Sequence, residues 1–331
     1  MLHWTIEKVS LHLKYAWTIS RGTSNTKTNF YIKVSDANYT GMGEVAPNLR
    51  YNETPEKTLS EFAKLLENGL PLAKKYEDII NLLQSYQITQ SLRCGIECAY
   101  ISYYCKKNNT NLHKYLSTKV VKEVNTSFSV PLMNVSEMHK FFLTHNLYRF
   151  KYIKLKVDEE HALSILKEAH NITDQPIIVD ANEGFTTGES FYKFMDAVQN
   201  INIEFIEQPF AQHMDEEYYF IKQNCPFAIF ADESAMHNPD FVKIKRQFDG
   251  INFKIMKSGG LMQTMRMIKE AKLFGMKIMI GCMVESTLAI SLAMHLASEA
   301  DYIDLDSFMY IDNDTTSYVK EYNGIITLLN S

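Results

Sequence analysis

Five charged residues recur along the chain at nearly regular intervals, each at the end of a short apolar stretch. They are Lys156 (YIKLK), Asp180 (IIVD), Glu207 (IEFIE), Asp232 (AIFAD) and Lys254 (INFK), and successive members are 22 to 27 residues apart. A strand of about five residues, a helix of about 11 to 12 and two short loops fill such a step. The spacing therefore predicts one repeating strand-and-helix unit that delivers each charged side chain to the same edge of a sheet.

The three acids of this set predict a metal site. Asp180, Glu207 and Asp232 end consecutive predicted strands, and neighbouring strands lie about 4.8 Å apart, so the carboxylates can meet at one ion. Oxygen ligands without histidine or thiolate favour Mg²⁺, or Mn²⁺, over zinc. The alternative for each acid alone is a cap on the helix that follows its strand. Three acids in consecutive units favour the metal site over three caps.

Lysines flank the three acids on both sides. Lys154 and Lys156 share a face of one strand, while Lys254 ends the strand beyond Asp232. Burial and a nearby cation lower the pKa of a lysine, which can then act as a base. A divalent cation at a substrate carboxylate stabilises the charge left when an α-proton departs. The alternative is that the lysines only neutralise the acids, and it is the preferred interpretation for Lys257, which is expected in the loop beyond the strand.

The elements that must position these residues form an α/β barrel. From about residue 126 the pattern alternates between strands and helical segments such as 159–172 and 261–275. Such alternation is typical of parallel strands, and eight units close a (β/α)7β TIM-type barrel, expected over 123–309, with its active site at the carboxyl ends of the strands. The eight predicted strands are 126–130, 152–156, 176–180, 203–207, 228–232, 250–254, 277–281 and 302–306.

The part of the chain before the barrel predicts an α+β capping domain over 1–122. The Thr54-Pro55 pair, followed by Glu56, is a helix start. The tail from about 310 to 331, rich in β-formers, is expected to return and pack on this domain. The predicted pieces of the domain are strands over 9–19 and 28–47, turn residues at 35–38 and 41–43, and helices over 54–106.

Composition excludes several classes of partner. The net charge of −5 argues against a basic surface that would bind nucleic acid. The sequence contains no run of 18 apolar residues, so it predicts no membrane span. The first ten residues lack the pattern of a signal peptide. Cys94, Cys98 and Cys105 share one predicted helix face without a Cys-x-x-Cys pair, so we interpret them as core thiols. The odd count of five cysteines suits a cytoplasmic protein. The oligomeric state stays open, a homo-oligomer included.

The motifs KYIKLK, IIVDAN, FIEQP, ADES and KIMKSGG resemble the enolase superfamily, in its muconate-lactonizing-enzyme-like subgroup. GMGEVAPNLRYNET (41–54) and RCGIECAYISYY (93–104) are similar to that family's capping domain and the helix leading into the barrel. GCMVES (281–286) lacks the histidine of the mandelate-racemase branch, and Val157 stands where the family commonly has glycine. The resemblance implies a Mg²⁺ site at Asp180, Glu207 and Asp232, an acid/base pair at Lys156 and Lys254, and Lys154 as a cationic neighbour.

The last predicted strand narrows the resemblance. Asp304 and Asp306 form an Asp-x-Asp that resembles the dipeptide epimerases, where such a pair holds the substrate's ammonium group. Arg21 matches the position where Ala-Glu epimerases place an arginine for a side-chain carboxylate. The alternatives are an exposed acidic loop or a helix cap for the aspartate pair, and a surface arginine for Arg21. Further residues expected to line the pocket are Ser129, Ser258, Met283 and Val284.

The resemblance thus implies a Mg²⁺-dependent dipeptide epimerase, an isomerase acting by 1,1-proton transfer, with L-Ala-D/L-Glu as the expected substrate and turnover of cell-wall peptides as its role. An N-acylamino acid racemase or an o-succinylbenzoate synthase is the alternative within the family, followed by a cycloisomerase. Their substrates carry no free ammonium group, so the Asp-x-Asp would have no function. A non-catalytic barrel that binds a partner is the alternative from another class, and it leaves the metal and base positions unexplained.

Overall fold

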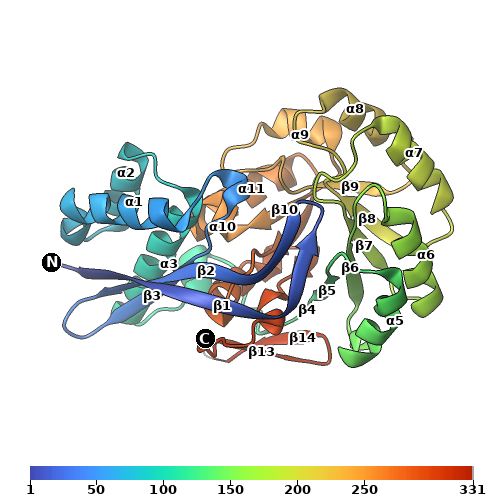
Figure 1. Cartoon of the computed structure of the whole chain (residues 1–331). Coiled ribbons are helices and arrows are strands. Elements are labelled where there is room, and N and C mark those ends of the chain that lie inside the picture. The colour runs from blue at the N-terminus through green and yellow to red at the C-terminus, as the bar shows by residue number, and fades with distance from the viewer. Residues whose placement is uncertain (330–331) are drawn as a thin grey trace.

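The computed structural model describes residues 1–329, and its larger part is a barrel of parallel strands ringed by helices (Figure 1). One sheet holds eight strands in the order β12-β11-β10-β9-β8-β7-β6-β5, each parallel to its neighbours. The predicted fold class is therefore confirmed. The strands are β5 (Ser127–Val130), β6 (Tyr152–Lys156), β7 (Ile177–Asp180), β8 (Ile203–Glu207), β9 (Ala228–Ala231), β10 (Gly250–Lys254), β11 (Lys277–Gly281) and β12 (Tyr302–Asp304).

Register explains why the charged residues gather. Lys156 lies opposite Asp180 across β6 and β7, and Asp180 lies opposite Glu207 across β7 and β8. On the far side, Lys254 lies opposite Gly281 and Gly281 opposite Asp304. Because these residues all stand at the carboxyl ends of parallel strands, their side chains share one mouth of the barrel.

The barrel interior has an apolar floor below this charged layer. Ile178, Phe205, Phe230 and Met279 form a separate buried cluster inside the barrel, and the rings of Phe205 and Phe230 stack with centroids 3.9 Å apart. Three of these residues lie two positions before an acid of the triad, and side chains two apart on a strand share a face. The floor therefore excludes water from beneath the charged groups, which strengthens their interactions.

Side-chain hydrogen bonds join β5, the first barrel strand, and the residue before it to β12, the last one, and to the residue that follows it. Ser127 Oγ donates to the carbonyl of Ile303 at 3.4 Å, and the backbone N–H of Leu305 donates to Thr126 Oγ1 at 3.0 Å. The predicted last strand, 302–306, ends at Asp304, because the chain turns at Asp306 into a short 3-10 helix, η5 (Ser307–Tyr310). Asp306 therefore lies in the loop rather than on the strand.

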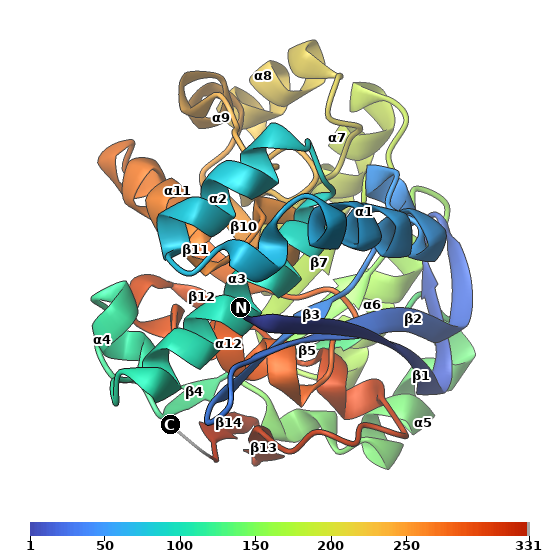
Figure 2. The ribbon, with the colours of Figure 1, turned by 90° about the vertical axis from the view of Figure 1, so that its left-hand side faces the viewer.

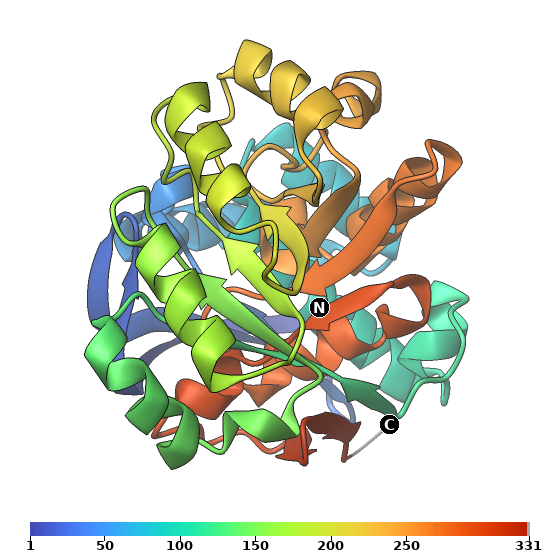
Figure 3. The ribbon, with the colours of Figure 1, turned by 90° about the vertical axis from the view of Figure 1, so that its right-hand side faces the viewer.

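Helices cover the outer face of the barrel (Figure 3). The large buried core lies between this helical layer and the strands, where residues such as Ile153, Val179 and Ile206 pack outward. The helices are α5 (Val135–Thr144), α6 (Ala162–Ile172), α7 (Gly188–Ala197), α8 (Asp215–Asn224), α9 (Phe241–Gln247), α10 (Ile255–Ser258), α11 (Leu261–Leu273) and α12 (Thr287–Met294).

The N-terminal part is an antiparallel sheet covered by helices, and it lies against the mouth of the barrel (Figure 2). Thr54 caps the first helix by accepting from the N–H of Lys57, and Pro55 opens that helix, as predicted. The elements are β1 (His3–Ile19), β2 (Gly22–Ser35), β3 (Thr40–Val45), α1 (Pro55–Glu67), α2 (Tyr76–Ser85), α3 (Gln90–Lys107) and α4 (Leu112–Leu116).

The glycines predicted as turn residues at 41–43 lie inside β3. A Cβ at Gly41 would stand 2.1 Å from the carbonyl oxygen of Ala99, and a Cβ at Gly43 would stand 2.2 Å from that of Gly95. These glycines therefore serve close packing of β3 on α3 rather than a turn. The cysteines of α3 are buried free thiols, as interpreted from the sequence.

The C-terminal tail contacts both parts of the molecule. Ile311 bridges Leu13 of β1, and the N–H of Asp312 donates to the carbonyl of His12 at 2.8 Å. Farther on, β13 (Val319–Tyr322) and β14 (Ile325–Leu328) extend a small sheet with β4 (Glu123–Asn125), the segment that leads into the barrel. Residues 330 and 331 of the predicted tail lie outside the described residues. Within residues 1–329, no helix is long and apolar enough to cross a membrane.

Candidate active site

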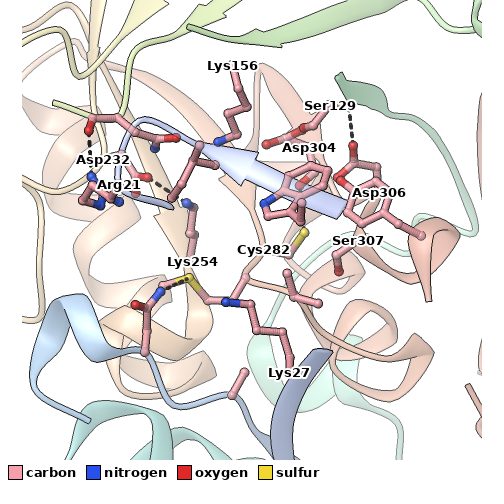
Figure 4. Close-up of a pocket in the computed structure, with 18 of the residues that line it drawn as sticks. Arg21, Lys27, Ser129, Lys156, Asp232, Lys254, Cys282, Asp304, Asp306 and Ser307 are labelled. Carbon is pink, nitrogen blue, oxygen red and sulfur yellow. Dashed lines mark hydrogen bonds and ion pairs between the residues drawn. The ribbon is translucent and has the colours of Figure 1, made fainter. Parts of the chain in front are cut away.

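A pocket lies where the carboxyl ends of the barrel strands face the N-terminal sheet (Figure 4). The hairpin between β1 and β2 reaches over it, and the 3-10 helix η1 (Leu49–Tyr51) borders it. Most of the residues predicted for the site line this pocket. Those are Arg21, Ser129, Lys154, Lys156, Asp232, Lys254, Met283, Val284, Asp304 and Asp306.

The three predicted metal ligands are buried beside this pocket, and Asp232 is the one of the three that lines it. Asp180 and Glu207 are 0% exposed and Asp232 is 1% exposed. The ammonium of Lys154 lies among acids, 3.0 Å from Asp180 Oδ2 and 2.9 Å from Glu207 Oε2, and its third partner is Asp304 Oδ2 at 2.8 Å. Across the described part of the chain, no three acidic, histidine or cysteine side chains are placed to hold one metal ion. The ammonium thus supplies the positive charge that gathers the acids.

The donor set nevertheless fits a hard divalent cation. Glu207 Oε1 accepts from Asn252 Nδ2 at 2.9 Å, whereas the buried Glu207 Oε2 has no hydrogen-bond partner in suitable geometry. Burial, and then the charge of Asp180, raise the pKa of Glu207 to about 7. A buried carboxylate oxygen that contacts a cation, here the Lys154 ammonium at 2.9 Å, without a well-aligned hydrogen bond is a natural ligand for Mg²⁺ or Mn²⁺. Such an ion would require the Lys154 ammonium to move aside.

The two predicted acid/base lysines stand on opposite flanks of the acids. Lys156 Nζ lies 2.5 Å from Asp180 Oδ2, and Lys254 Nζ lies 2.7 Å from Asp232 Oδ2. Burial alone would lower the pKa of Lys254, but the Asp232 carboxylate outweighs it and holds that pKa above its usual range. The lowered pKa expected from the sequence depends on a cation that neutralises these carboxylates.

Lys257 is a charged neighbour whose place the sequence did not predict. It lies on α10 rather than in a loop, is 1% exposed, and its Nζ lies 2.5 Å from Asp232 Oδ1. Burial lowers the pKa of Lys257 against the pull of Asp232. Asp232 thus carries two lysine partners, and the ion-pair interpretation fits this contact of Lys257.

Asp304, at the end of β12, and Asp306, in the loop that follows, differ in their surroundings. Asp304 Oδ1 accepts from Ser127 Oγ at 2.6 Å and from Ser129 Oγ at 3.3 Å, and Asp304 also pairs with Lys154. Asp306 accepts from the N–H of Ser129 at 2.5 Å and forms no ion pair with residues 1–329. Burial, and then Asp304, raise the pKa of Asp306 to about 7. Asp306 is therefore the acid of the pocket that lacks a cation.

Arg21 lies at the tip of the β1–β2 hairpin and is held by two acids. Its Nη2 is 2.9 Å from Glu233 Oε1, its Nη1 is 3.3 Å from Glu183 Oε2, and Nη1 also donates to the carbonyl of Asn182 at 2.7 Å. Arg50 of η1 makes a second pair with Glu183 at 2.7 Å. Asn182 and Glu183 adopt left-handed backbone conformations, with φ of 45° and 66°. This network ties the N-terminal part to the loops after β7 and β9.

The remaining predicted residues divide between the pocket and its surroundings. Met283 and Val284 line the pocket, and the carbonyl of Val284 accepts from Asn29 Nδ2 at 2.9 Å. Ser258 is fully buried outside the pocket lining, because α10 turns its carbonyl toward His237. Lining residues that the sequence did not single out include Trp17, Lys27, Tyr51, Asn182, Glu233, Cys282 and Tyr310. Four of them lie inside motifs quoted from the sequence: Tyr51 in GMGEVAPNLRYNET, Asn182 in IIVDAN, Glu233 in ADES and Cys282 in GCMVES. Trp17, Lys27 and Tyr310 lie outside those motifs.

Comparison with known proteins places the chain among related sequences and folds. A family model described as "Enolase C-terminal domain-like" matches residues 141–322. An L-Ala-D/L-amino acid epimerase from Flavobacterium johnsoniae is 26% identical and covers 98% of this chain and 96% of its own. An L-Ala-D/L-Glu epimerase from Bacteroides thetaiotaomicron is 26% identical and covers 96% and 83%. A dipeptide epimerase structure from Enterococcus faecalis V583, complexed with Mg and L-Leu-L-Tyr, is 21% identical, has a TM-score of 0.90 and covers 98% of this chain and 96% of its own.

Proposed function

The chain belongs to the enolase C-terminal domain-like family, and on that premise we propose that it is a magnesium-dependent dipeptide epimerase. It is an isomerase that inverts the α-carbon of the C-terminal residue of a dipeptide, with L-Ala-D/L-Glu as the favoured substrate. The observation that carries the proposal is the placement of Lys156 and Lys254 on opposite flanks of three buried acids. The epimerase names of the two relatives support it.

Inversion requires two proton-transfer groups, one on each face of the α-carbon. Lys156 on β6 and Lys254 on β10 stand on the two sides of β7, β8 and β9, so one lysine can take the α-proton and the other can return a proton to the opposite face. A single base would return the proton to the face from which it came. Lys154 adds positive charge beside them, and its charge opposes the carboxylates that raise the pKa of Lys254.

Asp180, Glu207 and Asp232 would hold Mg²⁺, which supplies positive charge at the substrate's α-carboxylate when bound. The aromatic floor formed by Phe205 and Phe230 keeps water from below the reacting centre. The three acids are held in place by their strand register and by lysine and asparagine partners, so little rearrangement of the backbone is required of them.

The pocket wall supports a substrate with a free amino terminus. Asp306, with Asp304 beside it, presents a carboxylate to the pocket and forms no ion pair with the part of the chain that the structure describes. An N-acylamino acid racemase or an o-succinylbenzoate synthase would leave this acid without a function. Ser129, Met283 and Val284 line the same wall, and Arg21 closes the pocket from the hairpin. We place the protein in the cytoplasm, where its free thiols suit a reducing compartment, and in the turnover of cell-wall peptides.

Exchange of the substrate α-proton in D₂O tests the proposal directly. With Mg²⁺ present, proton NMR should show loss of the C-terminal α-proton signal of L-Ala-L-Glu and growth of the L-Ala-D-Glu signals. Chelation of the metal should stop both. N-acetyl-L-glutamate serves as the comparison, because it keeps the carboxylates and lacks the ammonium group. Exchange of the acetyl compound without exchange of any dipeptide would refute the proposal.

Replacement of Asp306 by asparagine tests the ammonium site. We expect KM for L-Ala-L-Glu to rise at least about tenfold, since a hydrogen bond to a charged group contributes about 1.5–3 kcal/mol. In the native protein, KM should fall as pH rises through about 7, the pKa to which burial and Asp304 raise Asp306, because the carboxylate form binds the ammonium.

The shape of the pH profile separates this role from a general loss of structure. The dipeptide's own amino group loses its proton at about pH 8. The KM of the native protein should therefore pass through a minimum between the pKa of Asp306 and the pKa of this amino group. The Asp306→Asn variant should lose the acidic limb of the curve and keep the alkaline one. A KM profile identical to that of the native protein would remove Asp306 from substrate binding.

A further inference from the structure

Lys27 is a pocket cation that neither the sequence motifs nor the proposed mechanism uses. It lies on β2 of the N-terminal sheet, is half-buried and lines the pocket, and Figure 4 shows its side chain reaching toward the pocket centre. Its nitrogen makes no hydrogen bond or ion pair with any residue from 1 to 329. Burial lowers the pKa of Lys27, and no acid offsets that effect. An ammonium that loses water without gaining an anion carries a free-energy cost.

Every other cation that lines the pocket already has an acidic partner. Lys156 pairs with Asp180 and Lys254 with Asp232. Lys154 lies among three carboxylates. Arg21 is held between Glu183 and Glu233. Within residues 1–329, Lys27 is therefore the pocket cation that is free to bind an anionic group of a ligand. Asp306 is likewise the pocket acid that is free to bind a cationic group.

The backbone that carries Lys27 is fixed by its neighbour. Asn29 is two residues farther along β2, so its side chain shares the face of Lys27. Asn29 Nδ2 donates to the carbonyl of Val284 at 2.9 Å and to Glu44 Oε1 at 2.7 Å, which anchors the strand to the loop after β11. The Lys27 ammonium thus projects from an anchored strand, which reduces the entropy lost when it binds an anion.

We propose that Lys27 binds the side-chain carboxylate of the residue that is epimerised and so sets a preference for acidic dipeptides. The inference rests on the proposed function and deepens it. In an acidic dipeptide the α-carboxylate belongs to the site of the three acids, and the ammonium belongs to Asp304 and Asp306. The side-chain carboxylate is then the one charged group of the substrate without a partner. Lys27 is the pocket cation without an acidic partner among residues 1–329. Arg21, already neutralised by two acids, orients the hairpin.

The test compares a charged substrate with its neutral isostere. For each protein we would measure kcat/KM for L-Ala-L-Glu and for L-Ala-L-Gln and take the ratio. The Lys27→Met variant should lower this ratio at least about tenfold, because a charge-assisted hydrogen bond is replaced by an apolar contact. The Lys27→Glu variant should favour L-Ala-L-Lys over L-Ala-L-Glu. The matched control is Lys33→Met on the same strand, since the Lys33 side chain is 43% exposed and pairs with Glu7 outside the pocket.

Each outcome decides the inference. A ratio that falls in Lys27→Met and not in Lys33→Met supports it, as does reversal in Lys27→Glu. An unchanged ratio in Lys27→Met overturns it, most clearly if Arg21→Met lowers the ratio instead. Absence of epimerisation of any dipeptide by the native protein would overturn the proposed function together with this inference. If the native protein epimerises dipeptides but the ratio of the two kcat/KM values is the same in Lys27→Met, the inference alone is overturned.

Discussion

Replacement of Lys254 by methionine should reduce epimerisation by about 10²–10⁴-fold in both directions, the range that general acid–base groups contribute. Both directions fail because each needs one lysine to remove a proton and the other to return one. The α-proton of one enantiomer, the one that faces Lys156, should still exchange with D₂O. Lys156→Met should show the mirror result and exchange the other enantiomer only.

The ion-pair network makes these variants interpretable. Asp232 keeps its contact with Lys257 at 2.5 Å when Lys254 is removed, and Asp180 keeps its contact with Lys154 at 3.0 Å when Lys156 is removed. Neither variant leaves a buried acid without a cation, so both should fold. The control is Lys193→Met, since Lys193 is exposed on α7 and its one ion pair within residues 1–329 is with Glu189.

Proton NMR in D₂O, begun separately from L-Ala-L-Glu and L-Ala-D-Glu, distinguishes exchange from inversion. The two-lysine mechanism would be wrong if either variant inverted both dipeptides at the native rate. It would also be wrong if both variants exchanged the same enantiomer, since the lysines would then stand on one face.

The barrel and its charged ring could be predicted because parallel strands convert spacing along the chain into position in space. Lys156, Asp180 and Glu207 each end an apolar stretch, and in the structure they are direct register partners on adjacent strands. Seven of the eight strands match their predicted bounds to within one residue. The exception, the strand ending at Asp304, stops early because the chain must turn into a short helix at Asp306.

Contacts made by the N-terminal part could not be predicted, because they join residues far apart in the sequence. Arg21 meets Glu183 and Glu233 only when the hairpin lies over the barrel, so its partners cannot be read from local sequence. The same holds for Lys27, whose lack of an acid is a property of the folded pocket. Lys257 was misplaced because α10 begins directly after Lys254 and turns the side chain back toward Asp232.

Glutamine in place of Glu207 should weaken Mg²⁺ binding at least about 100-fold, since even residues that only support a metal ligand contribute about 10–100-fold to affinity. The substitution keeps the shape of the side chain and removes one negative charge from the buried set. The glutamine oxygen can still accept from Asn252, which holds the native Glu207 Oε1 at 2.9 Å. The effect should therefore come from the charge and from Oε2, the oxygen that lacks a hydrogen-bond partner.

A readout other than activity separates metal binding from catalysis. In the native protein, millimolar Mg²⁺ should raise the melting temperature, because a ligand that binds only the folded state stabilises it. Glu207→Gln should lose this rise and require far more Mg²⁺ for α-proton exchange. Glu204→Gln is the matched control, since Glu204 lies on the same strand and accepts from Tyr302 Oη at 2.7 Å outside the pocket. Glu207 stands on β8, between Asp180 on β7 and Asp232 at the end of β9, so an ion held by all three acids must contact it. An unchanged Mg²⁺ requirement in Glu207→Gln would therefore place the ion elsewhere.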